Sequence, residues 1–229
     1  MPRQGRVVLP GFPHHIVQRG HDRKVVFAAQ EDYLYYLDSL AEFKRVYEVR
    51  VYAYCLMTNH VHLLLEPSAE KGLAQLMKRL AGRQTRYRNR IEDRSGTLWE
   101  SRYKSSPVDT NGYLFECMRY VELNPVRARM VSTPEEYPWS SYSERIGKAS
   151  TPLLDPIPGQ NKHGKGDIGW VAAYQQFMQT AVPDGEWQKI REAAQRSQLT
   201  GNSGFIDQVE AILGRRVEWR QQGRPRMRD

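Results

Sequence analysis

The chain has 229 residues, of which 40% are hydrophobic, and this fits a globular protein with one core and a smaller additional part. No apolar stretch approaches the roughly 18 residues of a membrane span, and the basic N-terminus lacks the apolar segment of a signal peptide. These features exclude a membrane-spanning protein and favour a cytoplasmic one, while the formal net charge of +8 favours a polyanionic partner.

Hydrophobic patterns divide the first 128 residues into alternating strands and helices. The predicted strands are residues 13–19, 49–57 and 60–65, with extended segments at 98–100 and 103–108. The predicted helices are residues 30–47, 71–92 and 111–123. This order predicts an α+β fold, in which helices pack on an antiparallel sheet. Cys55 and Cys117 lie in apolar segments and no C-x-x-C pair occurs, so both are expected as buried thiols.

The composition changes towards the C-terminus. Prolines and glycines are frequent over 149–169, which is typical of a linker. The remainder is mostly helical in pattern and ends in an arginine-rich tail. The predicted division is a first domain over 1–145, a linker over 146–169 and a helical extension with a basic tail over 170–229.

Two histidines lie one residue apart on the strand predicted at 60–65. Strand side chains alternate between faces, so His60 and His62 point to one side. Val61 and Leu63 point to the other side, into a core. Two imidazoles side by side on a rigid strand can supply half of a metal site. The simpler interpretation is a chance pair of half-buried, hydrogen-bonded histidines.

The third predicted helix offers polar side chains on one face, namely Tyr113, Glu116, Tyr120 and Asn124. Tyr120 and Asn124 lie one turn apart, beside the apolar face that packs on the sheet. An asparagine carbonyl oxygen can join two imidazoles on a divalent cation, and a tyrosine one turn earlier can reach a phosphate bound to that cation. Alternatively, Tyr120 is a core residue and Asn124 caps the helix before Pro125.

A stripe of arginines runs along the second predicted helix. Its members are Arg79, Arg83, Arg86 and Arg90. Acidic residues come only at its end, with Glu92 and Asp93, so the stripe lacks partners one helical turn away. Such a surface suits a phosphate backbone, or it is an ordinary exposed helix face.

In combination, these motifs resemble a known family. The pair His60-Val61-His62 and the segment Tyr120-Val121-Glu122-Leu123-Asn124-Pro125-Val126-Arg127-Ala128 are similar to motifs of the Y1 branch of the HUH single-strand endonucleases. Within that branch the sequence most resembles the REP-associated tyrosine transposases, relatives of the IS200/IS605 transposases. The resemblance covers residues 5–145 and includes Leu98-Trp99-Glu100-Ser101-Arg102-Tyr103-Lys104.

The resemblance implies a ferredoxin-like core, an antiparallel sheet with helices packed on one face, followed by a mainly helical C-terminal extension. It implies that His60, His62 and Asn124 hold a divalent metal, Mg²⁺ or Mn²⁺. Tyr120 would then attack the scissile phosphate and form a 5′-phosphotyrosine link, leaving a free 3′-OH. Rejoining is the reverse step and needs no nucleotide cofactor.

The resemblance also implies a single-stranded or hairpin DNA substrate, with a short unpaired guide on the 5′ side of the hairpin. The arginine stripe and the basic tail would contact the backbone, Arg3 and Arg6 would read bases beside the hairpin foot, and Lys104 would contact the phosphate or the leaving group. The residues predicted to bind DNA are Arg3, Arg6, Arg79, Arg83, Arg86, Arg90, Lys104, Arg224 and Arg226. We expect a monomer, and a dimer is the alternative.

Two other functions fit the same residues. A metal-dependent phosphodiesterase would use water in place of Tyr120 as the nucleophile. A regulator would bind hairpin DNA through the basic surface without cleaving it. Both alternatives differ from a transposase in the role of the tyrosine.

Overall fold

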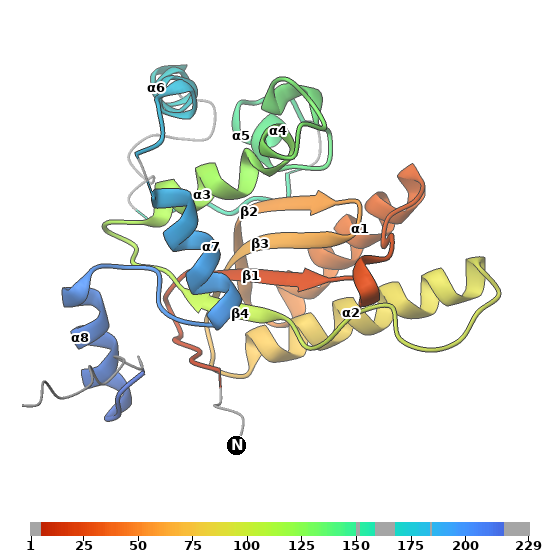
Figure 1. The fold of residues 1–229 in the computed structure, drawn as a ribbon, viewed down its shortest axis with the longest axis horizontal. Coiled ribbons are helices and arrows are strands. Elements are labelled where there is room, and N and C mark those ends of the chain that lie inside the picture. The colour runs from red at the N-terminus through yellow and green to blue at the C-terminus, as the bar shows by residue number, and fades with distance from the viewer. Residues whose placement is uncertain (1–5, 150–151, 159–167, 184, 218–229) are drawn as a thin grey trace, which may run out of the picture.

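A four-stranded antiparallel sheet forms the centre of the protein in a computed structural model that describes residues 6–149, 152–158, 168–183 and 185–217 (Figure 1). The strands are β1 (His14–Arg19), β2 (Val49–Met57), β3 (His60–Pro67) and β4 (Lys104–Pro107). They lie in the order β2-β3-β1-β4, and each neighbouring pair is antiparallel. With one helix after β1 and one after β3, this is the ferredoxin-like arrangement. The predicted fold class is confirmed.

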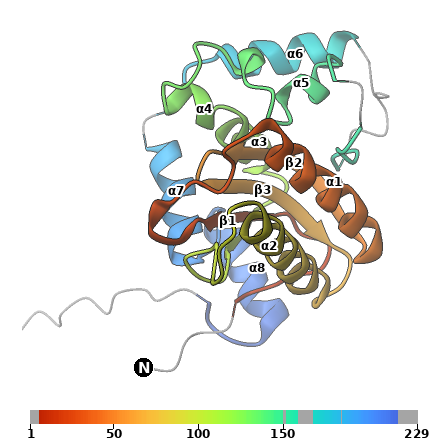
Figure 2. The same cartoon turned by 90° about the vertical axis from the view of Figure 1, so that its right-hand side faces the viewer.

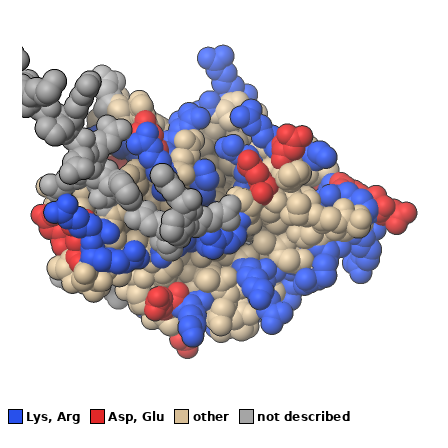
Figure 3. Space-filling model, turned by 60° about the horizontal axis from the view of Figure 1, so that its bottom comes forward, with Lys and Arg blue, Asp and Glu red and all other residues tan. Residues whose placement is uncertain are grey.

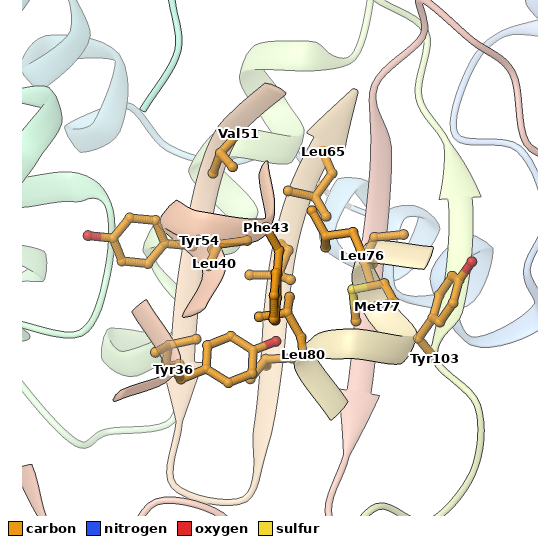
Figure 4. Close-up of a cluster of buried hydrophobic side chains, with 14 of the residues drawn as sticks. Tyr36, Leu40, Phe43, Val51, Tyr54, Leu65, Leu76, Met77, Leu80 and Tyr103 are labelled. Atoms are coloured by element: carbon orange, nitrogen blue, oxygen red, sulfur yellow. The ribbon is translucent and has the colours of Figure 1, made fainter. Parts of the chain in front are cut away.

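Helices α1 (Gln30–Val46) and α2 (Gly72–Ile91) cover one face of the sheet. Asp32 caps the start of α1 by accepting hydrogen bonds from the backbone N–H groups of Ala28 and Ala29, at 2.6 and 3.0 Å. The same carboxylate pairs with Arg88 of α2 at 2.6 Å, and both side chains are buried. This pair therefore ties the two helices together. Figure 4 shows part of the core beneath them, with Tyr36, Leu40, Phe43, Val51, Tyr54, Leu65, Leu76, Met77, Leu80 and Tyr103 labelled.

The opposite face of the sheet is also covered by helices. The sequence predicted helices on one face only. Helix α3 (Leu114–Glu122) packs on β2 and β3, and α7 (Glu186–Arg196) packs on β4 and β1. Strand β2 explains the need for a second layer, because all of its residues except Arg50 are buried. Cys55 and Cys117 lie in the core on this side as free thiols, as predicted.

Shorter elements complete the described part of the chain. They are α4 (Asn124–Arg127), α5 (Tyr142–Arg145), α6 (Ile168–Gln179), α8 (Ser203–Leu213) and two 3₁₀ turns at His21–Arg23 and Pro134–Glu136. Figures 1 and 2 show α6 and α8 at opposite ends of the molecule. Within the described residues, no helix combines the length and the apolar character needed to cross a membrane.

The predicted linker is packed against the sheet in the part that the structure describes. Leu153 and Leu154 are buried in the core under α1. Asp155 exchanges two hydrogen bonds with the backbone of Val51 on the edge strand β2, at 2.7 and 2.8 Å, and pairs with Lys44 at 2.6 Å. Residues 152–158 therefore protect this edge of the sheet. The division at residues 145 and 169 stays a prediction.

Candidate active site

His60 and His62 point to the same face of β3, the face covered by α3 and α7. Antiparallel pairing places His60 beside Arg19 of β1, and His62 beside Val17. Directly opposed residues of an antiparallel pair share a face, so these four side chains lie together. Val61 lies between the two histidines and Leu63 follows them, and both are buried in the core under α1 and α2.

Tyr120 and Asn124 meet the two histidines in one cavity of about 290 Å³. The ring centroids of His60 and His62 are 5.0 Å apart, and those of His62 and Tyr120 are 5.8 Å apart. The full lining is Val17, Arg19, Met57, His60, His62, Tyr120, Asn124, Arg127, Ala128, Arg191, Ala194 and Gln195. The four residues singled out in the sequence are thus brought together, within one chain.

Asn124 stands at the junction of α3 and α4. Its amide nitrogen donates a hydrogen bond to the carbonyl oxygen of Tyr120 at 2.8 Å, and a longer one to Val121 at 3.4 Å. The side chain therefore caps the C-terminal end of α3, as the simpler interpretation proposed. This bonding uses the amide nitrogen, so the oxygen of the same amide is available to the cavity. Capping and cation binding are compatible at this residue.

His15 is a member of the site that the sequence did not single out. It is fully buried on β1, and its Nε2 atom lies 2.9 Å from Nδ1 of His62. The two imidazoles are stacked, and the edge of the Tyr120 ring lies against His15. The only signal in the sequence is that His15 shares its strand face with Val17 and Arg19. That signal could not be used without knowing that β1 pairs with β3.

The electrostatic surroundings keep the site histidines neutral. Burial and, to a smaller extent, the nearby charge of Arg19 lower the pKa of His60 to about 4. Burial also lowers the pKa of His62 well below its usual value, and the neighbouring His60, His15 and Arg127 act in the same direction. Neutral imidazoles keep a nitrogen lone pair, which a metal ligand requires.

The donor set fits a divalent cation. His60 is oriented by a 2.7 Å contact between its Nδ1 atom and Oδ1 of Asn59, so Nδ1–H donates and Nε2 keeps its lone pair. His62 is held in the same way through its Nδ1 contact with His15. Two imidazole nitrogens and an amide oxygen suit a divalent ion that keeps open positions. Within the described ranges, no group of three or more His, Cys, Asp or Glu side chains forms another metal site.

The C-terminal extension forms one wall of the cavity. Trp187 of α7 packs against Tyr120, with 5.5 Å between ring centroids. The guanidinium of Arg127 lies 4.8 Å from the centre of the Tyr120 ring and 4.2 Å from that of Trp187. Arg191 and Gln195 line the cavity from the same helix. The tyrosine is therefore enclosed by histidines on one side and by an arginine and a tryptophan on the other.

A buried ionic network holds α3 in place. The carboxylate of Glu122 is fully buried and accepts hydrogen bonds from Ser141 at 2.6 Å, Arg145 at 2.9 Å and Tyr174 at 2.8 Å. One turn earlier, Arg119 pairs with Glu186 at the start of α7 at 2.9 Å. The helix that carries Tyr120 is thus anchored to α5, α6 and α7.

The predicted DNA-binding residues are spread over a wider surface. Lys104 is exposed at the start of β4, and Arg86 and Arg90 are exposed on α2. Arg79 donates to the hydroxyl of Tyr47, and Arg83 pairs with Glu42 of α1 at 2.5 Å, so half of the stripe also joins the two helices. Arg6 stacks on Tyr103. Arg3, Arg224 and Arg226 lie outside the described residues.

Comparison with a family model places the site in context. The model for IS200-like transposases matches residues 11–124. This segment of the chain belongs to the IS200-like transposase family. It contains all four strands of the sheet together with His60, His62, Tyr120 and Asn124.

One of two similar solved structures supports the fold. The structure of a REP-associated tyrosine transposase bound to a REP hairpin is similar with a TM-score of 0.56 and 14% sequence identity, over 68% of this chain and 92% of that chain. A putative transposase from Deinococcus radiodurans R1 gives a TM-score of 0.37 and 19% identity, over 56% of this chain and 92% of that chain. Among functionally curated proteins, none matches this sequence.

Proposed function

We propose that the protein is a metal-dependent single-strand DNA endonuclease and transposase that cleaves and rejoins DNA at REP-like hairpin elements. The observation that carries this proposal is the meeting of Tyr120, His60, His62 and Asn124 in one cavity within the IS200-like transposase segment. The hairpin substrate is suggested by the similar protein that was solved with a REP hairpin. We further propose that the chain acts as a monomer in the cytoplasm.

His60, His62 and Asn124 would hold Mg²⁺ or Mn²⁺, which when bound would polarise the scissile phosphate and offset the charge that develops on its oxygens. Tyr120 supplies the nucleophile. Its oxygen bonds to phosphorus while the bond from phosphorus to the 3′ oxygen breaks. The phenol proton leaves, and a proton is taken up by the 3′ oxygen. One phosphoester replaces another, so the reaction can run backwards without a nucleotide cofactor.

Other residues in and beside the cavity would position these groups. Trp187 and Arg127 enclose the ring of Tyr120 and restrict its orientation. Arg19, Arg127 and Arg191 bring positive charge to the cavity, which favours a bound phosphate and its transition state. The DNA backbone would be contacted by Lys104, by the arginine stripe of α2 and by the basic ends of the chain.

Covalent capture tests the proposal directly. The full-length protein is incubated with Mn²⁺ and a DNA hairpin that has unpaired flanks, and the products are separated in SDS. We expect an SDS-resistant adduct with the wild-type protein and none with Tyr120→Phe. Tyr113→Phe is the matched control, because this tyrosine precedes the same helix and does not line the cavity. It should form the adduct normally.

Two outcomes would favour the other functions. Cleavage that persists in Tyr120→Phe without an adduct would indicate a phosphodiesterase that uses water. Tight hairpin binding without cleavage under any divalent metal would indicate a regulator. We also expect His62→Ala to abolish cleavage and to leave hairpin binding nearly intact, because binding depends on arginines and not on the metal. A gel-shift assay beside the cleavage assay separates the two effects.

A further inference from the structure

A second large cavity lies on the other side of the sheet from the active site. It has a volume of about 670 Å³ and is bounded by α2 and by residues 97–103, which lead into β4. The small residues Ala74, Ala81 and Gly82 of α2 form one wall, and Trp99 and Tyr103 form the opposite wall. Figure 4 shows Tyr103 at the margin of the core beside Met77, another residue that lines this groove. We call it the α2 groove.

A smaller cavity of about 240 Å³ links the α2 groove to the active site. It shares Val17, Arg19 and Gln195 with the active-site cavity. It shares Gln18, Glu100, Ser101 and Arg102 with the α2 groove. Successive side chains of β1 point to opposite faces, so one strand end contributes to both sides. The three cavities therefore form one path around the end of β1 and the short edge strand β4.

Positive charge accompanies this path. Arg6, Lys78 and Arg102 line the α2 groove, and Arg19 and Lys104 line the linking cavity, whereas Glu100 is the one carboxylate in the lining of either. Figure 3, which brings the α2 side forward, shows Lys and Arg side chains spread widely over this face and Asp and Glu in smaller groups. A path of this charge is suited to a phosphodiester chain.

Gln18 adds a group that is suited to recognition of a base. Its side chain is 5% exposed and lies where the linking cavity meets the α2 groove. The amide nitrogen donates to the carbonyl oxygen of Ser101 at 3.4 Å, but the buried amide oxygen has no partner in the described part of the chain. A buried acceptor without a partner is unfavourable, and a donor from a ligand would relieve this. Glutamine side chains commonly pair with the edges of bases.

We propose that a stretch of unpaired DNA next to the scissile phosphate follows this path from the active site around β4 and places a base in the α2 groove. The inference rests on the proposed function, since DNA is the ligand in both. The volume of the groove lies in the range of small-molecule sites and cannot admit a duplex, so the occupant is a single strand. Arg6, stacked 4.0 Å over Tyr103, closes the wall against which a base would lie.

The test measures what an unpaired flank adds to hairpin affinity. Fluorescein-labelled hairpins carry no flank, an unpaired 5′ flank or an unpaired 3′ flank, and binding to the full-length protein is followed by anisotropy. The readout is the ratio of affinities with and without the flank. We expect a flank on one side to raise wild-type affinity at least tenfold. No gain from a flank on either side would overturn the inference.

Two pairs of variants locate the flank. Arg102→Gln removes a charge from the path, and Arg45→Gln removes an exposed arginine of α1 that lines none of the three cavities. Ala74→Leu narrows the α2 groove, and Gln75→Leu places the same side chain at the next position of α2, outside the groove. Arg102→Gln and Ala74→Leu should each lower the affinity ratio at least threefold, and both controls should keep it. An unchanged ratio in both groove variants would overturn the inference.

Photocrosslinking gives an independent readout. A 5-iodouracil placed in the flank should crosslink to the peptide that contains residues 97–103. Crosslinks found only in α3 and α7 would contradict the path around β4. Failure of this inference can be distinguished from failure of the proposed function. A Tyr120-dependent adduct together with an unchanged ratio refutes the groove alone, and flank binding without any adduct refutes the cleavage reaction alone.

Discussion

Replacement of His15 by leucine should weaken metal binding although His15 is not one of the proposed ligands. His62 can use Nε2 as a ligand only when its proton is on Nδ1. That Nδ1–H group lies 2.9 Å from Nε2 of His15, which then accepts the hydrogen bond. Leucine cannot accept it, so metal-bound His62 would keep a buried donor without a partner. Loss of such a supporting bond typically lowers metal affinity about 10- to 100-fold, or about 1.4–2.8 kcal/mol.

The assay is a titration of the purified protein with Mn²⁺, followed by electron paramagnetic resonance of the free ion, with thermal unfolding recorded in parallel. His14→Leu is the matched control, because His14 is equally buried on the same strand. It accepts a hydrogen bond from the backbone N–H of Leu9 and donates one to the carbonyl oxygen of Phe12. Its loss should lower stability and leave Mn²⁺ affinity unchanged.

A conservative variant separates positioning from packing. His15→Gln retains an acceptor on a side chain of similar reach, so it should recover part of the affinity that His15→Leu loses. The reasoning is refuted if His15→Leu unfolds at the wild-type temperature and binds Mn²⁺ with wild-type affinity. It is also refuted if His14→Leu and His15→Leu weaken Mn²⁺ binding equally.

Three further predictions concern stability. Burial lowers the pKa of His14 to about 4 and that of His15 to about 3, whereas unfolded histidine titrates at about 6.5. The unfolded state therefore takes up protons first, and each residue should cost about 2 kcal/mol of unfolding free energy between pH 7 and pH 5, seen as a lower urea midpoint. Asp32→Asn should cost roughly 3 kcal/mol in the same assay, because it leaves a buried arginine of α2 without its main partner. Gly20→Ala should lower the melting temperature, because the added Cβ would meet the carbonyl oxygen of Lys24 and come within 2.8 Å of a Val26 methyl group. Gly82→Ala is the control and should keep the melting temperature, because its Cβ meets only a flexible arginine side chain.

The sequence predicted those parts of the site that depend on local periodicity. Alternation along β3 places His60 and His62 on one face, and the helical repeat places Tyr120 and Asn124 one turn apart. Both inferences need only the geometry of a single element. The prediction that the two elements meet came from the family resemblance, and the shared cavity agrees with it.

Other parts of the site depend on tertiary structure and could not be predicted. His15 joins His62 through the register between β1 and β3, which pairs Val17 with His62. Arg191 reaches the cavity and Trp187 reaches the ring of Tyr120 because α7 packs on β1 and β4. A proline- and glycine-rich segment separates α7 from the first domain in sequence. The partner of Arg83 was missed for the same reason, since Glu42 comes from another helix and not from a neighbouring turn.

The contacts of Glu122 bear on where this protein can be divided. The segment that matches the IS200-like family stops at Asn124, yet the groups that neutralise the Glu122 carboxylate come from residues 141–174. A fragment restricted to that segment would retain every proposed ligand and the nucleophile, but the carboxylate of Glu122, two residues from Tyr120 and two from Asn124, would lose these partners. Short proteins that carry only the family motifs would need other hydrogen-bond donors for this carboxylate. Chimaeras that exchange the C-terminal extension would have to exchange Glu122 with it.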